Sequence, residues 1–155
     1  MGLPLNPNQS IAALNPRTEN RREVSKITLI ASSAGLNNKY FLIWSNAGTS
    51  YHVWFNRAAG GSDPAPGVST GIEVAIGASD TAAQVAAAVK TALEVETFGV
   101  TREGAVLQIT DGNSGPATNI EAGDSGLTVE TLFEGAAETY APGMSPADIS
   151  NNPSV

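Results

Sequence analysis

The chain has 155 residues, of which 41% are hydrophobic and only 15% are charged, so it can build the core of a single domain but has little charged surface. Eight Lys and Arg residues against fifteen Asp and Glu residues give a net charge of −7, which disfavours general binding to nucleic acid because the phosphates would be repelled. The chain has no cysteine, which excludes disulfides, thiolate zinc sites and cysteine nucleophiles.

Residues 1–25 are predicted to form an extended arm, because prolines and amide side chains dominate this stretch. The run from Ile11 to Leu14 is a small apolar patch suited to docking on a partner. From Glu103 onward the chain carries acids but no Lys or Arg. This asymmetry favours head-to-tail contacts between copies, and simple solvation of a polar arm explains it equally well. Half of the eight cations lie in the arm or directly after it, namely Arg17, Arg21, Arg22 and Lys26.

Three strands are predicted in the first half of the chain. Residues 26–31 (KITLIA) form the first. Residues 39–45 and 50–56 carry both tryptophans and several β-branched side chains, and the turn residues between them predict a β-hairpin. Both faces of this hairpin are apolar, so we expect it to be central and covered on each side.

Residues 57–70 (RAAGGSDPAPGVST) are predicted to form a long loop, because Gly, Pro and small residues fill the stretch. The loop is longer than most hairpin connections, and long ordered loops are often contact sites. We therefore predict a subunit-contact surface here, at Asp63 and Pro64.

A strand pattern turns into a helix pattern between residues 71 and 93. Every second residue from Ile72 to Ile76 is aliphatic, which predicts a strand. Residues 81–93 form the one convincing helix, since Thr81 and Gln84 have capping-box spacing and alanine is abundant. We expect a sheet to pack against the apolar face of this helix, which is formed by Ala82, Val85, Val89, Ala92 and Leu93.

The remaining elements are short strands. Residues 98–102 and 105–111 predict a second hairpin, and residues 127–133 predict the last strand. Within that strand, Leu127, Val129 and Phe133 are expected on one side.

The predicted fold class is α+β, with a mostly antiparallel β-sheet or small sandwich and one α-helix packed on it. The core domain covers residues 26–135. Residues 136–155 contain three prolines and predict a second, C-terminal arm.

Few residues suggest chemistry. His52 is the sole histidine and lies in an apolar strand, where a histidine is usually a packing or a surface residue. Residues 123–126 (GDSG) resemble the sequence around the nucleophile of trypsin-like proteases, but the chain is too short for two such barrels and a turn is the better interpretation. Asp111, Asn113 and Asp124 could donate oxygens to Ca²⁺, but the full EF-hand pattern is missing. The sequence therefore predicts no catalytic residue, cofactor or metal site.

The hairpin, the loop and the helix together resemble a module of tailed-bacteriophage virion proteins. The resemblance starts at residues 51–56 (YHVWFN), passes through the loop with its Asp-Pro dipeptide and residues 70–76 (TGIEVAI), and reaches the helix that follows residues 80–83 (DTAA). It covers about residues 38–135. The resemblance implies a structural role in the particle and supplies no catalytic residues.

These features lead to the hypothesis of a non-enzymatic virion structural protein, in the first place a capsid decoration or cement protein that stabilises the head through its arms. A tail or neck component is the first alternative. A glycan-binding or host-binding module is the second, and for it we would expect Trp44 or Trp54 to be exposed beside polar groups.

The expected partners are other virion proteins, such as the major capsid protein or tail and neck proteins, and copies of the chain itself. No contact with nucleic acid or membrane is expected, since no apolar run reaches the length of a membrane span. The N-terminus lacks a signal-peptide core, which predicts assembly in the host cytoplasm and a final location in the virion. The predicted subunit-contact residues are Ile11, Leu14, Arg17, Arg21, Arg22, Asp63, Pro64, Tyr140 and Met144.

Overall fold

The computed structural model describes residues 20–45, 47–96 and 98–137. The strands in this part of the chain are β1 (Val24–Thr28), β2 (Tyr40–Trp44), β3 (Ser50–Arg57), β4 (Thr70–Ile76), β5 (Gly99–Glu103), β6 (Val106–Thr110) and β7 (Thr128–Phe133). Its helices are a short 3-10 turn, η1 (Ala34–Leu36), and the α-helix α2 (Ala82–Leu93).

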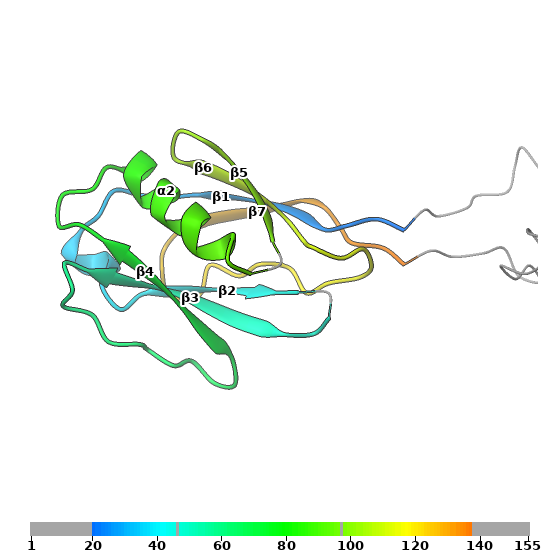
Figure 1. Ribbon diagram of the computed structural model, residues 1–155, viewed down its shortest axis with the longest axis horizontal. Coiled ribbons are helices and arrows are strands. Elements are labelled where there is room, and N and C mark those ends of the chain that lie inside the picture. Colours follow the sequence, from blue (N-terminus) through cyan, green and yellow to red (C-terminus); the bar gives the residue numbers. More distant parts are fainter. Residues whose placement is uncertain (1–19, 46, 97, 138–155) are drawn as a thin grey trace, which may run out of the picture.

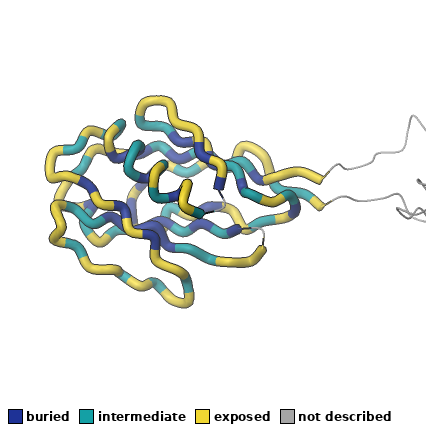
Figure 2. Tube along the Cα trace, in the orientation of Figure 1, coloured by how far each residue is buried: buried dark blue, intermediate teal, exposed yellow. Residues whose placement is uncertain are grey.

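The strands form two sheets that face each other as a sandwich (Figure 1). One sheet has the order β5-β6-β1-β7 and is antiparallel, and the other has the order β2-β3-β4. Buried residues concentrate between the two sheets (Figure 2). The predicted α+β class is confirmed, as a small sandwich with one helix packed on it. The largest fully buried side chains include Phe41, Phe55, Ile27, Ile43, Leu93 and Leu107.

The pair formed by β3 and β4 is parallel, which the sequence analysis did not predict. A parallel partner must start at the same end of the sheet as β3, so residues 58–69 carry the chain back along the outer side of the β2-β3-β4 sheet (Figure 1). The predicted long loop is therefore a crossover connection. β3 becomes the central strand, and four consecutive residues from His52 to Phe55 are buried, because the core covers one face and the crossover covers the other.

α2 closes one side of the sandwich. It packs on β4 of one sheet and on β5 and β6 of the other, through the buried face formed by Val85, Ala86, Val89 and Leu93. The predicted capping box is present, since Thr81 Oγ1 accepts a hydrogen bond from Gln84 N and the Gln84 side chain accepts one from Thr81 N.

We expect Thr81→Ala to lower the free energy of unfolding by about 1 kcal/mol, because it removes the acceptor that satisfies a backbone N–H group in the first turn of the helix. Thr91→Ala is the matched control in the same helix. Thr91 Oγ1 only donates to the Ala87 carbonyl one turn earlier, and alanine is the better helix former. Denaturant unfolding that gave the two variants equal stability would contradict the capping role.

The opposite side of the sandwich is closed by the chain that leads into β7. Leu42 and Glu121 exchange backbone hydrogen bonds of 2.8 and 3.0 Å, so this edge of β2 is paired. Ser125 N donates to Tyr40 O at 3.1 Å. Gly123 has a φ of 56°, and a Cβ atom there would lie 2.5 Å from Tyr40 O. The GDSG sequence is therefore a tight turn that fits against β2, as the turn interpretation predicted.

The prediction that Phe133 lies on the buried side of β7 is wrong, because Phe133 is 54% exposed. A bulge interrupts the pairing of β1 with β7, since Val24 pairs with Phe133 but Ser25 pairs with Thr131. The extra residue in β7 reverses the alternation of its side chains at the end of the strand.

The first strand begins two residues before the predicted start of the core domain, and it ends at Thr28, so that Ile30 lies outside it and is exposed. The residue before it, Glu23, is buried. The inward-facing residues here, Glu23 and Ser25, are polar. The sequence therefore lacks the alternation of apolar and polar residues from which the start of this strand could have been predicted.

The chain enters and leaves the sandwich side by side (Figure 1). Arg21 and Ala136 exchange two backbone hydrogen bonds of 2.9 Å. We call residues 21–23 and 134–136 the terminal junction. Residues 1–19 and 138–155, which make up most of the two predicted arms, lie outside the described residues.

Candidate functional site

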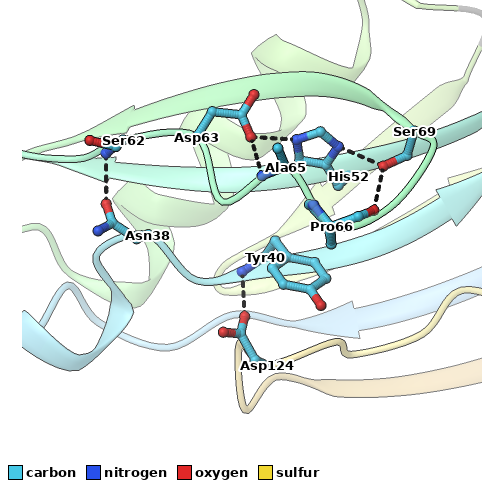
Figure 3. A network of polar contacts seen from close by, with 9 residues as sticks. All are labelled: Asn38, Tyr40, His52, Ser62, Asp63, Ala65, Pro66, Ser69 and Asp124. Atoms are coloured by element: carbon cyan, nitrogen blue, oxygen red, sulfur yellow. Dashed lines mark hydrogen bonds and ion pairs between the residues drawn. The ribbon is translucent and has the colours of Figure 1, made fainter.

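A buried histidine holds the crossover connection against the sheet. His52 lies on β3, on the face turned away from the core, and is 2% exposed. Its Nε2 atom is 2.6 Å from Asp63 Oδ1, and its Nδ1 atom is 2.7 Å from Ser69 Oγ (Figure 3). Because Asp63 and Ser69 both belong to the connection of residues 58–69, one side chain fixes this connection at two points. We call His52, Asp63 and Ser69 the loop clasp.

Gly71 makes room for the loop clasp. It is the second residue of β4 and pairs with His52 across the parallel ladder. A Cβ atom at this position would lie 2.6 Å from Asp63 Oδ2 and 3.0 Å from His52 Nε2. Only glycine therefore allows the carboxylate and the imidazole to meet above the strand.

Asp63 accepts a second hydrogen bond from its own loop, and its contacts affect its pKa. Asp63 Oδ1 also accepts a hydrogen bond of 2.7 Å from Ala65 N. Burial alone would raise the pKa of Asp63, but the hydrogen bonds from Ala65 and His52 and the charge of His52 outweigh it and lower that pKa. The ionised carboxylate accepts the hydrogen bond from Nε2. Ser69 Oγ, which lies 2.7 Å from Nδ1, also donates to Pro66 O at 3.1 Å.

The residue types are those of a Ser–His–Asp triad, in which the histidine accepts the serine proton. Here Ser69 Oγ donates to the Pro66 carbonyl, and His52 is buried beneath the loop. The three side chains form a polar contact between a strand and a loop.

Asparagine side chains fix the rest of the connection. Asn56 Oδ1 accepts from Gly61 N at 2.9 Å, and Asn38 Oδ1 accepts from Ser62 N at 2.8 Å (Figure 3). Such contacts hold the loop in a conformation that costs about 1 kcal/mol for each non-glycine residue with positive φ. Those residues of the connection are Ala58, Ala59 and Ala65. The result is an ordered surface loop in which Val68 is fully exposed.

The structure separates the predicted subunit-contact residues into groups. Asp63 is engaged in the loop clasp, and its neighbour Pro64 is half-buried. Arg21 lies in the terminal junction, where its Nε donates to Glu134 O at 2.8 Å, and Arg22 is exposed beside it. Ile11, Leu14, Arg17, Tyr140 and Met144 lie outside the described residues.

The candidate calcium ligands are not brought together. Asp111 Oδ1 accepts from Asn113 N at 3.0 Å, which is a turn contact near the Trp44 end of β2. Asp124 lies at the other end of β2, where it accepts from Tyr40 N and is paired with Lys39. Among the described residues, no group of three His, Cys, Asp or Glu side chains could hold a metal ion.

Neither tryptophan provides an exposed aromatic platform. Trp54 is 7% exposed, and Trp44 is half-buried beside a small cavity. The exposed aromatic group that a glycan-binding module would need is therefore not supplied by these two residues.

Comparisons of the chain with protein-family models, with curated proteins and with solved structures found no match. In the described part of the chain, no helix combines the length and the apolar character that crossing a bilayer requires.

Proposed function

We propose that this chain is a non-enzymatic structural protein of a tailed-bacteriophage virion, and specifically a capsid decoration protein. The observation that carries the proposal is the terminal junction. Because Arg21 pairs with Ala136, residues 1–19 and 138–155 both start from one end of the sandwich and can contact the same neighbouring protein.

The resemblance to virion modules supports the same proposal. Its sequence parts, YHVWFN, the Asp-Pro loop and TGIEVAI, contribute His52, Asp63 and Gly71. These residues meet at the loop clasp. These residues of the shared pattern hold a long crossover connection in place, and this role requires no catalytic activity. A rigid loop and two segments leaving one end suit a building block with several contacts.

Deletion of terminal segments tests the proposal. We expect removal of residues 1–19, or of residues 138–155, to reduce incorporation into virions at least tenfold, because each deletion removes contacts with the neighbouring protein. A tenfold loss of affinity corresponds to about 1.4 kcal/mol of binding free energy. The described domain of residues 20–137 should keep its unfolding transition. Replacing residues 1–19 by a Gly/Ser segment of equal length is the matched control, since it preserves length but removes the apolar patch.

Full incorporation of both deletion variants, measured by quantitative mass spectrometry of purified particles, would contradict arm-mediated attachment. A tail or neck role remains the alternative, and copy number separates it from decoration, because a ring contains few copies and a shell many.

A further inference from the structure

Glu23 is a buried carboxylic acid in the terminal junction. It directly precedes β1 and is 5% exposed. Ser25 Oγ donates to Glu23 Oε1 at 3.2 Å. The second oxygen, Oε2, is buried and has no hydrogen-bond partner among the described residues. In an ionised carboxylate, this oxygen would carry negative charge in a buried site with no donor among the described protein groups, which has a large free-energy cost.

A cavity of about 10 Å³ adjoins this carboxyl group. This volume is close to the smallest that can hold one water molecule. A water molecule there can accept a hydrogen bond from protonated Oε2 and donate one to the carboxylate of Asp111. The polar lining comes from Glu23, Ser25 and Asp111, and the apolar lining from Ile43, Trp44, Phe98, Ile109 and Ile120.

The charged groups around Glu23 also favour its neutral form. Asp111 follows β6 and Glu134 follows β7, whereas β2 contributes only residues that do not titrate. The nearby Arg21 donates its Nε to the backbone of Glu134. Burial, with repulsion from Glu134 and Asp111, raises the pKa of Glu23 above its ordinary value of 4.5, and the hydrogen bond from Ser25 opposes this only in part.

We infer that Glu23 holds a proton and one water molecule in this cavity, and that this proton keeps the terminal junction closed. Glu23 belongs to the entering strand of the junction and Glu134 to the leaving strand. Ionisation of Glu23 therefore places a negative charge in a buried site and opposite another acid. Separation of residues 21–23 from residues 134–136 exposes the charge to solvent and reduces this repulsion.

The direction of the pH effect follows from the raised pKa. The contribution of Glu23 to stability is complete below its ordinary pKa of 4.5 and is lost as the pH rises through the pKa of the folded protein. The junction from which both terminal segments leave is thus closed in acid and loosened in base.

Backbone amide exchange in the full chain tests this inference. The amides of Arg21 and Ala136 form the junction pair, and their opening is measured by NMR after correction for intrinsic exchange. Between about pH 3 and about pH 8 we expect their opening constant to rise at least tenfold, because the open form loses the Glu23 proton at a lower pH than the closed form. The Leu42 amide, which pairs with Glu121, is the internal reference and should not change.

Glu23→Gln should abolish this pH dependence, whereas Glu103→Gln, at an exposed acid of β5, should retain it. An equal pH dependence in Glu23→Gln and the wild type would overturn the inference. A carbon-13 titration of the Glu23 carboxyl group in the wild type gives a second measure that needs no variant. A midpoint clearly above 4.5 supports the buried proton, and a midpoint at or below that value contradicts it.

Discussion

Replacement of Gly135 by alanine is expected to lower the free energy of unfolding by about 3 kcal/mol, at the upper end of what overpacking costs. A Cβ atom at Gly135 would lie far inside the contact distance of the Gly115 carbonyl oxygen and 3.3 Å from Glu23 N. These neighbours are backbone atoms, so they cannot move aside by changing a rotamer. Gly115 N also donates to Arg21 O, so the clash would disrupt the terminal junction itself.

Gly99→Ala is the matched control for this prediction. Gly99 lies in β5 of the same sheet, and a Cβ atom there would meet its nearest neighbours at 3.8 Å, an ordinary van der Waals contact. Denaturant unfolding should therefore give a value close to wild type for Gly99→Ala. A Gly135→Ala protein as stable as the Gly99→Ala protein would show that the two backbones are not packed closely at this point.

Removal of the histidine of the loop clasp is expected to have the second large effect. His52→Ala should cost about 3 kcal/mol, because it opens a cavity on the central strand and removes the contacts of the ring with Asp63 and Ser69. Asp63→Asn should cost less, since the Asp63 side chain is 44% exposed and water can replace part of the contact. The double-mutant cycle should give a coupling energy of about 1 kcal/mol between the two side chains.

Serine variants provide a control within the same loop. Ser69→Ala removes the hydroxyl that contacts His52 Nδ1, and we expect a loss of about 1 kcal/mol. Ser62→Ala should be close to neutral, since Ser62 is exposed and is held by its backbone N–H group. Equal stabilities for the Ser69→Ala and Ser62→Ala variants, or a coupling energy near zero for His52 and Asp63, would remove the basis for the clasp.

The loop clasp also predicts an acid-labile crossover. The pKa of Asp63 is lowered from its ordinary value of 3.8, so its contribution to stability is present above that pH and is lost as the pH falls through the lower pKa of the folded state. Amide exchange at Ala65, which donates to Asp63, should accelerate there in the wild type. In Asp63→Asn the amide should show no such step. An identical step in both proteins would assign the effect to another acid.

Local sequence patterns were sufficient to predict most elements of this fold. The helix was predictable because its cap, Thr81 with Gln84, and the regular spacing of its apolar residues lie within thirteen consecutive residues. The two hairpins were predictable because turn residues separate short apolar strands. In each case the interactions that form the element lie close together in the sequence.

The parallel pairing of β3 with β4 and the loop clasp depend on contacts that a local pattern does not contain. His52 meets Asp63 and Ser69 only after the crossover has folded over the sheet. The one available signal was Gly71, because a glycine within a strand often marks the close approach of another group. Together with a lone histidine in the preceding strand, it could have indicated a polar contact here.

The end of the sandwich was predicted least accurately. The bulge that exposes Phe133 depends on register between β1 and β7, which neither strand specifies alone. Glu23 was assigned to a polar arm, because the sequence alone does not distinguish a buried acid from a solvent-exposed one. Its position follows from the packing of backbone from three distant segments, seen in the contacts of Arg21 with Gly115 and Ala136.

Electron cryomicroscopy of assembled virions, with copies of this chain counted, tests the proposed function most directly. The proposal predicts on the order of hundreds of copies on the outside of the head, because a shell repeats one contact by symmetry, with the terminal-junction end of the sandwich facing the capsid. A small ring of copies at the neck or tail would contradict capsid decoration and support the alternative role as a tail or neck component. Particles that lack the chain altogether would contradict a structural role in the virion.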